Sequence, residues 1–416
     1  MTTSSRVYDW NAVDDASGTL PVLLDDETLR DGLQSPSIET PAIEKRIEIL
    51  RLMESLGIEC ADIGFPAASE RAARDTERIA REIVTAGMRI QPNCAARTVV
   101  GDIRPIVEIS QRVGTPIEVA AFIGSSPIRQ FVEDWTIDDL EQRTEAAVSF
   151  AVRERLPIFL VTEDTTRAEP QSLRRIYGAA LRAGARRVCV ADTVGHATPE
   201  GARAVVRFVR TIIDECGVDA GIDWHGHDDR GLAVANSLAA IDAGATRVHA
   251  TALGIGERVG NTPMELLLVN LVLLGYMDRD LTDLHRYCAA VSEVCERPIP
   301  VNYPIFGRDA FRTATGVHAA AIIKAFRKGA PELADAIYSS VPAHLVGREQ
   351  EIEIGPMSGR SNIVYWLEHR GVDVQDTLVD HIFTAAKQAS RVLREDEVWV
   401  LVSDQGIKGS RDQGTP

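Results

Sequence analysis

Long apolar runs, paired cysteines and an excess of positive charge are all missing from this 416-residue sequence. No stretch reaches the about 18 consecutive apolar residues that a membrane-spanning helix needs, so we expect no membrane partner. The N-terminal segment has no apolar centre of the kind found in secretory signals. We therefore interpret residues 1–19 as a flexible arm.

Cysteine is scarce, with six residues in the chain and no CxxC pair among them. This spacing argues against a disulfide framework and against a zinc site made of thiolates. We expect the protein to work in the reducing environment of the cytoplasm.

Acidic residues outnumber basic ones by 61 to 45, and the formal net charge is −16 at pH 7. A chain this acidic repels the phosphate backbone, so we expect no nucleic-acid partner. The same charge means that an anionic ligand must be held by a local group of positive side chains. The apolar fraction, 45%, is ordinary for a soluble globular protein.

Eight short apolar runs alternate with helix-length segments up to residue 254. They span residues 21–27, 58–65, 89–95, 117–124, 158–164, 187–193, 221–227 and 247–254. Turns such as "AGA" and "AGAT" precede several runs, as expected where glycine ends a helix. The alternation is typical of a (β/α)8 TIM barrel, with an open doubly wound sheet as the main alternative. Eight units whose strands end in polar residues favour the barrel.

Polar side chains stand where several of these runs end. Asp31 follows the first run, Glu163 and Thr193 lie at the ends of the fifth and sixth, and His225 and His227 end the seventh. In TIM barrels the catalytic residues come from the C-terminal ends of the strands. We therefore predict that these side chains line one mouth of the barrel.

The alternation stops after residue 285. Turn-rich, helical and extended segments follow, which indicate a smaller α+β region instead of a ninth barrel unit. We predict a TIM-barrel catalytic domain over residues 20–285, a C-terminal region over 286–405 and a flexible tail over 406–416.

His225 and His227 are two residues apart on a predicted strand, so their side chains point to one face. Two imidazoles and a carboxylate are typical ligands of a catalytic divalent cation with open coordination positions. Asp31 can supply the carboxylate, because strands one and seven are near neighbours around a barrel. The alternative is a pair of rim histidines that bond to loop carbonyls. Asp228 and Asp229 could orient the imidazoles or cap the next helix.

The glycine-rich stretch "GIGERVGN" (residues 254–261) does not match the dinucleotide pattern G-x-G-x-x-G, because Gly260 comes one place late. It also does not open a βαβ unit at the start of the chain. We interpret it as a tight rim loop that places Asn261 near the metal.

Two motifs carry a resemblance to a known family. "LRDGLQ" (residues 29–34), followed by ten residues and Lys45, is similar to the first signature of the 2-isopropylmalate/homocitrate synthase family. "IDWHGHDDRGLAVA" (residues 222–235) resembles the second signature. The wider group consists of metal-dependent barrel acyltransferases and lyases that share LRDG and HxH. The resemblance extends from near residue 20 to near residue 400, and "ADTVG", "GIGERVGN" and "SGR" also fall where these synthases have them.

The resemblance implies a metal centre and a group that stabilises negative charge. The implied metal ligands are Asp31, His225, His227 and Asn261. Arg30 resembles the residue that stabilises the developing oxyanion. The cation itself, Mg, Mn or Zn, is left open.

Four further residues take roles from the same resemblance. Glu163 matches an active-site carboxylate, and Thr193 matches a substrate-binding hydroxyl. His318 matches the histidine that the family uses in proton transfer. Tyr338, nine residues before Gly347, has the family's spacing for a catalytic-site tyrosine, although the surrounding residues differ.

The implied activity is a Claisen-type condensation of acetyl-CoA with a 2-oxo acid, with hydrolysis of the thioester, as in acyltransferases of EC class 2.3.3. The main alternative is a metal-dependent lyase or aldolase on the same barrel, which cleaves a carbon–carbon bond. A non-catalytic binding protein is disfavoured by the intact set of Arg30, Asp31, His225 and His227.

The sequence leaves open which 2-oxo acid is the acceptor substrate. The candidates are pyruvate, 2-oxoisovalerate, oxaloacetate, 2-oxoglutarate, phenylpyruvate and a phosphonate analogue. "DIGFP" (residues 62–66) resembles the isopropylmalate branch more than homocitrate synthases. Family members that make leucine usually carry a long regulatory domain after the SGR region. This sequence continues only a short way beyond that region, which puts feedback regulation through such a domain in doubt. The resemblance also implies a homodimer in which the C-terminal region reaches over the partner's active site.

The segment "IIKAFRKG" follows His318 and offers positive charge for the phosphates of coenzyme A. On a helix, Lys324 and Lys328 share a face and Arg327 lies beside them. We predict that these three residues bind the cofactor's phosphates. The alternative is an ordinary solvated helix face.

Overall fold

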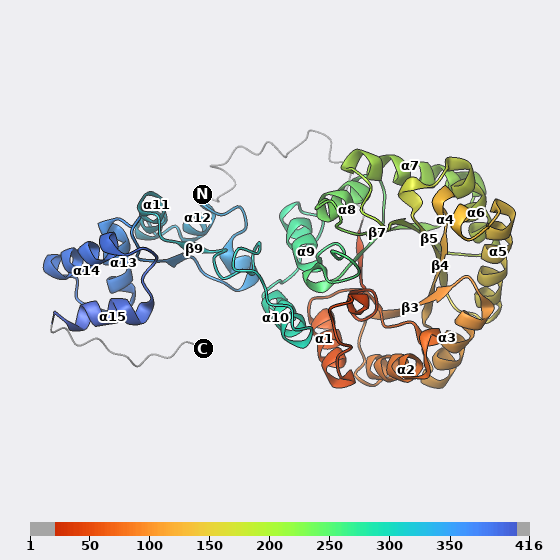
Figure 1. Ribbon diagram of the computed structural model, residues 1–416, viewed down its shortest axis with the longest axis horizontal. Coiled ribbons are helices and arrows are strands. Elements are labelled where there is room, and N and C mark those ends of the chain that lie inside the picture. The colour runs from red at the N-terminus through yellow and green to blue at the C-terminus, as the bar shows by residue number, and fades with distance from the viewer. Residues whose placement is uncertain (1–20, 406–416) are drawn as a thin grey trace. The chain divides into compact units, whose positions relative to one another are not determined.

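The computed structural model describes residues 21–405, and Figure 1 shows its helices and strands. The predicted arm (residues 1–19) and tail (residues 406–416) lie outside the described residues. The described chain forms two compact units, which divide between Pro298 and Ile299.

The first unit is a TIM barrel, as the alternating pattern predicts. Its eight parallel strands pair in chain order, and β8 closes the ring on β1. The strands are β1 Leu23–Asp26, β2 Cys60–Asp62, β3 Gln91–Arg97, β4 Glu118–Gly124, β5 Ile158–Glu163, β6 Arg187–Asp192, β7 Gly221–Gly226 and β8 Arg247–Ala250. Closure excludes the open doubly wound sheet.

Helices surround the strands on the outside of the barrel (Figure 1). The α-helices are α1 Ile43–Ser55, α2 Glu70–Thr85, α3 Val100–Val113, α4 Pro127–Val132, α5 Ile137–Arg153, α6 Pro170–Ala183, α7 Pro199–Cys216, α8 Ala233–Asp242, α9 Met264–Leu273 and α10 Leu284–Val294. Short 3-10 helices follow several strands, namely η2 Gly32–Gln34, η3 Pro66–Ala68, η4 Thr165–Arg167 and η5 Ala252–Gly254.

Helix α7 shows how local sequence sets these boundaries. The side chain of Thr198 accepts a hydrogen bond from the backbone of Gly201, and Pro199 occupies the first turn, where no backbone donor is needed. Gly217 ends the helix in the left-handed region at φ 65°. The face between these two ends is buried against the barrel through residues such as Val206 and Val209.

Helix α10 belongs to the barrel unit, so the division in the structure comes later than the predicted boundary at residues 285/286. The reason is a buried contact at the first strand. Tyr287 of α10 lies with its hydroxyl 3.2 Å from Thr28 Oγ1 and donates to Asp26. A helix anchored in this way packs as part of the barrel.

The second unit mixes helices with one short parallel ladder. Its elements are β9 Arg312–Thr313, α11 Gly316–Arg327, α12 Pro331–Ala336, η6 Ala343–Val346, β10 Glu351–Ile352, α13 Arg360–His369, α14 Asp376–Gln388 and α15 Glu395–Ser403. Trp366, Leu367, Leu378 and Ile382 are among the residues that form its core. This agrees with the predicted α+β character of the region.

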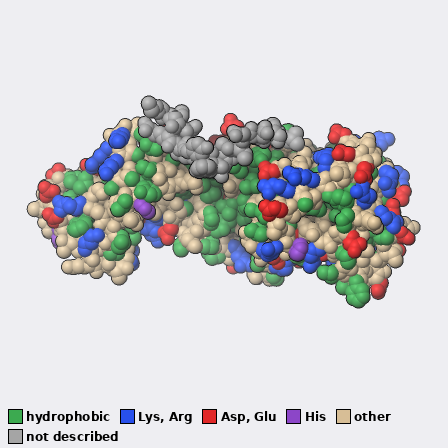
Figure 2. All heavy atoms as spheres, turned by 90° about the horizontal axis from the view of Figure 1, so that it is seen from above, with side chains coloured by type: hydrophobic (Ala, Val, Ile, Leu, Met, Phe, Trp, Pro, Cys, Tyr) green, Lys and Arg blue, Asp and Glu red, His purple; other side chains and the backbone are tan. Residues whose placement is uncertain are grey.

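Charged side chains of both signs lie on the surface of the described chain. Figure 2 shows basic and acidic side chains interspersed on the face in view. Within residues 21–405, every helix is too short or too polar to cross a membrane.

The interior of the barrel carries charge where an apolar core would be usual. Arg247 of β8 is 2% exposed and donates to Asp223 of β7 at 2.6 Å and to Glu118 of β4 at 2.7 Å. Because β4 and β8 lie on opposite sides of the ring, the bond from Arg247 to Glu118 crosses the interior. Asn93 of β3 donates to both oxygens of Asp25 of β1 at 2.8 Å. Buried charges persist only when they are paired, so this network fixes the cross-section of the barrel.

Replacing Arg247 with Met should destabilise the protein strongly, because Asp223 and Glu118 would lose a buried partner. Breaking a buried ion pair costs about 3–5 kcal/mol. Urea unfolding followed by circular dichroism measures the change. The matched control is Arg174→Met, which removes an exposed pair with Glu215 and should cost at most about 1 kcal/mol. Equal unfolding midpoints for the two variants would contradict the prediction.

Candidate functional site

Four side chains from three separate stretches meet at the mouth of the barrel. His225 lies in β7, and His227 follows it and forms a backbone bridge with Asn261. His225 Nε2 lies 3.1 Å from His227 Nε2, and His227 Nε2 lies 3.9 Å from Asp31 Oδ2. Asn261 Nδ2 donates to Asp31 Oδ2 at 2.5 Å. The structure brings all four residues together, and their role as metal ligands stays a prediction.

The donor atoms of this group suit a divalent cation. Asp31, His225 and His227 offer ligand atoms that lie within 4.8 Å of one another. Asn261 Oδ1 is buried and has no hydrogen-bond partner within the described residues, so it can bind a cation without losing a bond. The two facing Nε2 atoms of the histidines must share either a proton or a cation. Two imidazoles and two oxygens are a typical donor set for such an ion.

Burial and neighbouring charges set the protonation of these donors. Burial, together with the neighbouring His225, lowers the pKa of His227 to about 4, so its imidazole is neutral at pH 7. Burial alone would raise the pKa of Asp31, but Arg30 and His225 outweigh it and hold the pKa below its usual value. A neutral imidazole and an ionised carboxylate are the forms that bind metal.

Arg30 lies beside the group and donates to three carboxylates. The distances are 2.6 Å from Nε to Asp62, 2.5 Å from Nη1 to Asp31 and 3.1 Å from Nη2 to Glu27. Burial raises the pKa of Asp62 to about 7, although Arg30 opposes the shift. The guanidinium of Arg30 is therefore held by carboxylates from three positions, beside the candidate metal group.

The loop over residues 254–261 is a tight turn, as the sequence indicates. Gly260 has a φ of 100°, and a Cβ there would lie 1.7 Å from the carbonyl oxygen of Gly254. The backbone N–H of Asn261 donates to that same oxygen at 3.0 Å. Only glycine fits at position 260, and this close approach holds Asn261 at the rim.

Glu163 and Thr193 stand at neighbouring strand ends. Glu163 ends β5 and lies 3.9 Å from Arg129, and burial raises the pKa of its carboxyl. Thr193 follows β6, and its hydroxyl oxygen accepts from the backbone N–H of Asp164 at 2.8 Å. Because the oxygen is used as an acceptor, the hydroxyl proton remains available to donate to a ligand.

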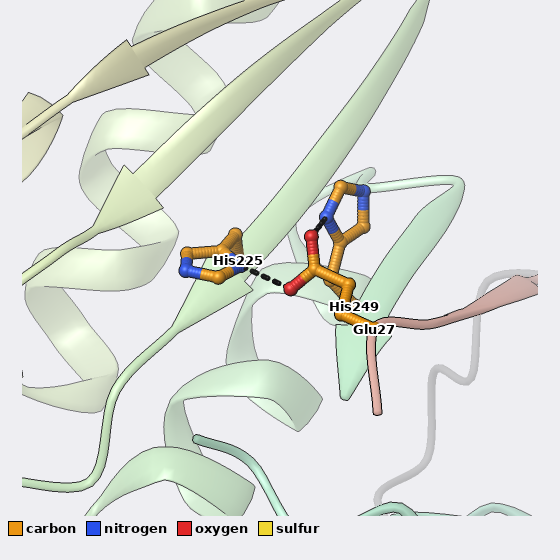
Figure 3. A group of neighbouring side chains, drawn as sticks. All are labelled: Glu27, His225 and His249. Atoms are coloured by element: carbon orange, nitrogen blue, oxygen red, sulfur yellow. Dashed lines mark hydrogen bonds and ion pairs between the residues drawn. The ribbon is translucent and has the colours of Figure 1, made fainter. Parts of the chain in front are cut away.

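A second group of titratable side chains, to which the sequence analysis assigned no role, adjoins the first. Figure 3 shows Glu27 between two imidazoles, with Oε2 2.7 Å from His225 Nδ1 and Oε1 3.0 Å from His249 Nδ1. Burial would lower the pKa of His249, but Glu27 outweighs it and raises the pKa to about 10. Burial would raise the pKa of Glu27, but His225 and His249 hold it well below its usual value.

A sequence signal for this second group does exist. Asp25 of β1 and Glu27, directly after that strand, are two residues apart, as are Arg247 and His249 along β8. Polar residues at a spacing of two within an otherwise apolar strand indicate a polar inward face.

Asp228 and Asp229 bond away from the imidazoles. Asp228 Oδ1 accepts from the backbone N–H of Ala233 at 2.9 Å and so caps the start of α8. Asp229 forms an ion pair with Arg258 at 2.9 Å. The capping interpretation therefore holds for Asp228.

The remaining predicted residues belong to the second unit. His318 is exposed in α11 and stacks on Tyr338, with ring centroids 4.0 Å apart. Lys324 and Arg327 lie in the last turn of α11 and Lys328 follows it, and all three are exposed. Arg327 pairs with Glu368 at 3.3 Å, so Lys324 and Lys328 offer the more available charges.

Sequence comparisons with known proteins identify a family and relatives of this chain. The HMGL-like family model matches residues 22–294. A homocitrate synthase of Methanopyrus kandleri is 33% identical over 373 residues, which cover 88% of this chain and 87% of that protein. A 2-isopropylmalate synthase of Shouchella clausii is 32% identical over 389 residues, covering 91% of this chain and 72% of that protein.

Solved structures of lyases match about two thirds of this chain. Hydroxymethylglutaryl-CoA lyase from Pseudomonas aeruginosa matches with a TM-score of 0.55 and 20% identity, over 68% of this chain and 96% of that one. The HMG-CoA lyase from Brucella melitensis matches with a TM-score of 0.55 and 19% identity, over 66% of this chain and 99% of that one. At such identities the likeness shows the fold.

Proposed function

The chain belongs to the HMGL-like family, and from this premise we propose that it condenses acetyl-CoA with a 2-oxo acid. The reaction is of the Claisen type and ends in hydrolysis of the thioester. Its products are a 2-alkylmalate-type acid and free CoA. The enzyme is thus an acyltransferase of the kind grouped in EC class 2.3.3.

One observation carries the proposal. Asp31, His225, His227 and Asn261 converge at the barrel mouth with the guanidinium of Arg30 beside them. A 2-oxo acid presents a carboxylate and a keto oxygen on adjacent carbons, and these two oxygens can chelate a cation held by such a group. Relatives named homocitrate synthase and 2-isopropylmalate synthase align with most of this chain.

The extent of the sequence alignments favours a synthase over a lyase. Relatives named homocitrate synthase and 2-isopropylmalate synthase align with 88–91% of this chain at 32–33% identity. The lyase structures, at 19–20% identity, share the barrel fold and align with 66–68% of it.

The residues at the mouth have separable tasks. We propose that Asp31, His225, His227 and Asn261 hold a divalent cation, which when bound would polarise the keto group of the acceptor as a Lewis acid. Mg, Mn and Zn all remain candidates. Arg30 stays charged in the site and presents its donors to the oxyanion that forms on the acceptor. Thr193 donates its free proton to the acceptor's carboxylate, and Glu163 lines the active site.

The proton balance needs a further group. A base removes a proton from the methyl group of acetyl-CoA, and the resulting carbon attacks the keto carbon of the acceptor. The keto oxygen then takes up a proton, and water hydrolyses the thioester to release CoA. We propose His318 for the proton transfer, because an imidazole can both accept and donate a proton, with Tyr338 stacked against it as a second polar group.

We further propose a homodimer in which the second unit of one subunit completes the site of its partner. The support is the exposure of the stacked pair, since His318 is exposed and Tyr338 is 50% exposed. A cytoplasmic location agrees with six free cysteines.

The proposed contact with coenzyme A lies on α11. Lys324 and Lys328 are exposed beyond His318 on the same helix, with Arg327 between them. A polyanion that approaches a protein of net charge −16 needs such local positive charge.

Purified protein with Mn²⁺, Mg²⁺ or Zn²⁺, acetyl-CoA and a panel of 2-oxo acids should release free thiol, which a chromogenic disulfide reagent detects. Replacing His227 with Ala should lower the rate more than about 100-fold, because losing a metal ligand should reduce activity more than losing a residue that only hydrogen-bonds to a ligand. The control is His285→Ala, an exposed histidine of α10, which should keep full activity. Undiminished turnover after removal of metal by a chelator would refute the metal-dependent reaction.

Inactive Asp31→Ala and inactive His318→Ala subunits should restore activity when they are mixed, because a hybrid dimer would contain one intact composite site. Subunit exchange is verified by differential affinity tags, and thiol release measures the recovery. If tagged hybrids form and stay inactive, the composite site is refuted.

Replacing Lys324 and Lys328 with Ala should raise KM for acetyl-CoA about 3–10-fold, as expected for two exposed ion pairs, and leave KM for the 2-oxo acid unchanged. High salt should mimic the double substitution, because exposed charges are screened. The control Arg391→Ala removes an exposed charge that pairs with Glu397 and should change neither constant. An unchanged KM for acetyl-CoA in the double variant would show that these lysines are ordinary surface residues that do not bind the cofactor.

A further inference from the structure

Glu27 is almost fully enclosed and uses its two carboxylate oxygens on two different imidazoles (Figure 3). Oε2 lies 2.7 Å from His225 Nδ1, and Oε1 lies 3.0 Å from His249 Nδ1. An ionised carboxylate can only accept hydrogen bonds, so both Nδ1 atoms carry their protons toward it. Arg30 is the third donor to this carboxylate, with Nη2 3.1 Å from Oε1.

This bond decides which nitrogen of His225 is free. With Nδ1 protonated and directed at Glu27, the atom left for a cation is Nε2. That atom faces His227 Nε2 at 3.1 Å, within the candidate metal group. A ring whose tautomer and orientation are already fixed binds a cation without first having to rearrange.

His249 holds the carboxylate in place from the other side. It is 2% exposed, and its Nε2 lies 3.3 Å from Asp223 Oδ2. Asp223 is held in turn by Arg187 at 2.6 Å and by Arg247 at 2.6 Å. A continuous series of bonds therefore runs from the charged interior of the barrel to His225.

Glu27, His225 and His249 could also be read as a second cation site, since their ligand atoms lie within 4.8 Å of one another. Two contacts disfavour that interpretation. His225 would have to bind a second ion through Nδ1 and give up its bond to Glu27. Asp223 already engages the other nitrogen of His249.

We propose that Glu27 and His249 are positioning residues, which preset His225 as an Nε2 ligand of the catalytic cation. The inference rests on the proposed cation site at Asp31, His225, His227 and Asn261. Glu27 acts directly on His225, whereas His249 acts only through Glu27.

Cation binding to the full-length, metal-free protein tests this without reference to turnover. Co²⁺ is titrated while its visible absorption is recorded, and the bound metal is counted by elemental analysis. Wild type should bind one equivalent. Glu27→Gln, which keeps the shape but loses the charge, should bind Co²⁺ about 10–100-fold more weakly, as is typical when a group supporting a ligand is removed.

The order of effects separates this role from a merely structural one. His249→Gln should weaken binding less than Glu27→Gln, because the bond from Glu27 to His225 survives. The double variant should match Glu27→Gln alone, because both residues act through the same bond. The matched control is Asp335→Asn, which weakens a carboxylate–imidazole bond of 2.6 Å to His344 in the other unit and should leave Co²⁺ affinity unchanged.

Circular dichroism identifies variants that do not fold, and Glu27→Gln and His249→Gln serve as independent tests. Wild-type affinity in both folded variants would overturn the proposal, as would additive losses in the double variant. Two equivalents in wild type, with one lost in each variant, would show instead that Glu27 and His249 are ligands. If wild type released thiol from acetyl-CoA but both variants bound Co²⁺ normally, this inference alone would fail. If wild type bound no cation, the proposed metal centre would fail with it.

Discussion

The closure of β8 on β1 is the constraint on which the rest of the barrel unit depends. That pairing sets Asp25 opposite His249 and turns a sheet with two open edges into a ring with none. It also brings the end of β1 beside the ends of β7 and β8, which lie far from it in the sequence. The bond from Asn261 to Asp31 and the bond from His249 to Glu27 both span this closure.

Much of the barrel could be predicted because the signals are local. Alternation of apolar runs with helix-length segments, with glycine ending helices, gives eight strands and their order. Two histidines at a spacing of two on a strand share a face in any fold, which places His225 and His227 together. Since strand ends share one rim in a TIM barrel, Asp31 could be added from its position alone. The tight loop before Asn261 could also be predicted, because its glycines favour a turn.

What could not be predicted depends on pairing between distant strands. Glu27 stands in a cluster of charge that resembles a solvated strand end. Its spacing of two from Asp25 indicates that these two side chains share a face, but the partners that they meet there follow only from the pairing of β1 with β8. In the sequence, His249 is an isolated polar residue, and its role cannot be predicted until its partners on β1 and β7 are known. Helix α10 joins the barrel through Tyr287, whose buried bond to Asp26 has no counterpart in the helical pattern. His318 and Tyr338 stack on each other in the second unit, and the proposal that they complete a barrel site depends on assembly, which local patterns do not encode.

The distribution of the mouth residues along the chain has a consequence for synthesis on the ribosome. β1 and Asp31 emerge first, whereas β8 and Asn261 follow only after six intervening strands have been made. Until then Asp25 and Glu27 remain hydrated carboxylates on a strand with one open edge. A nascent chain that stops before residue 247 has neither a complete ring nor a complete set of donors. The candidate centre is therefore assembled late in translation, and an interrupted chain exposes the charged strand that the finished barrel encloses.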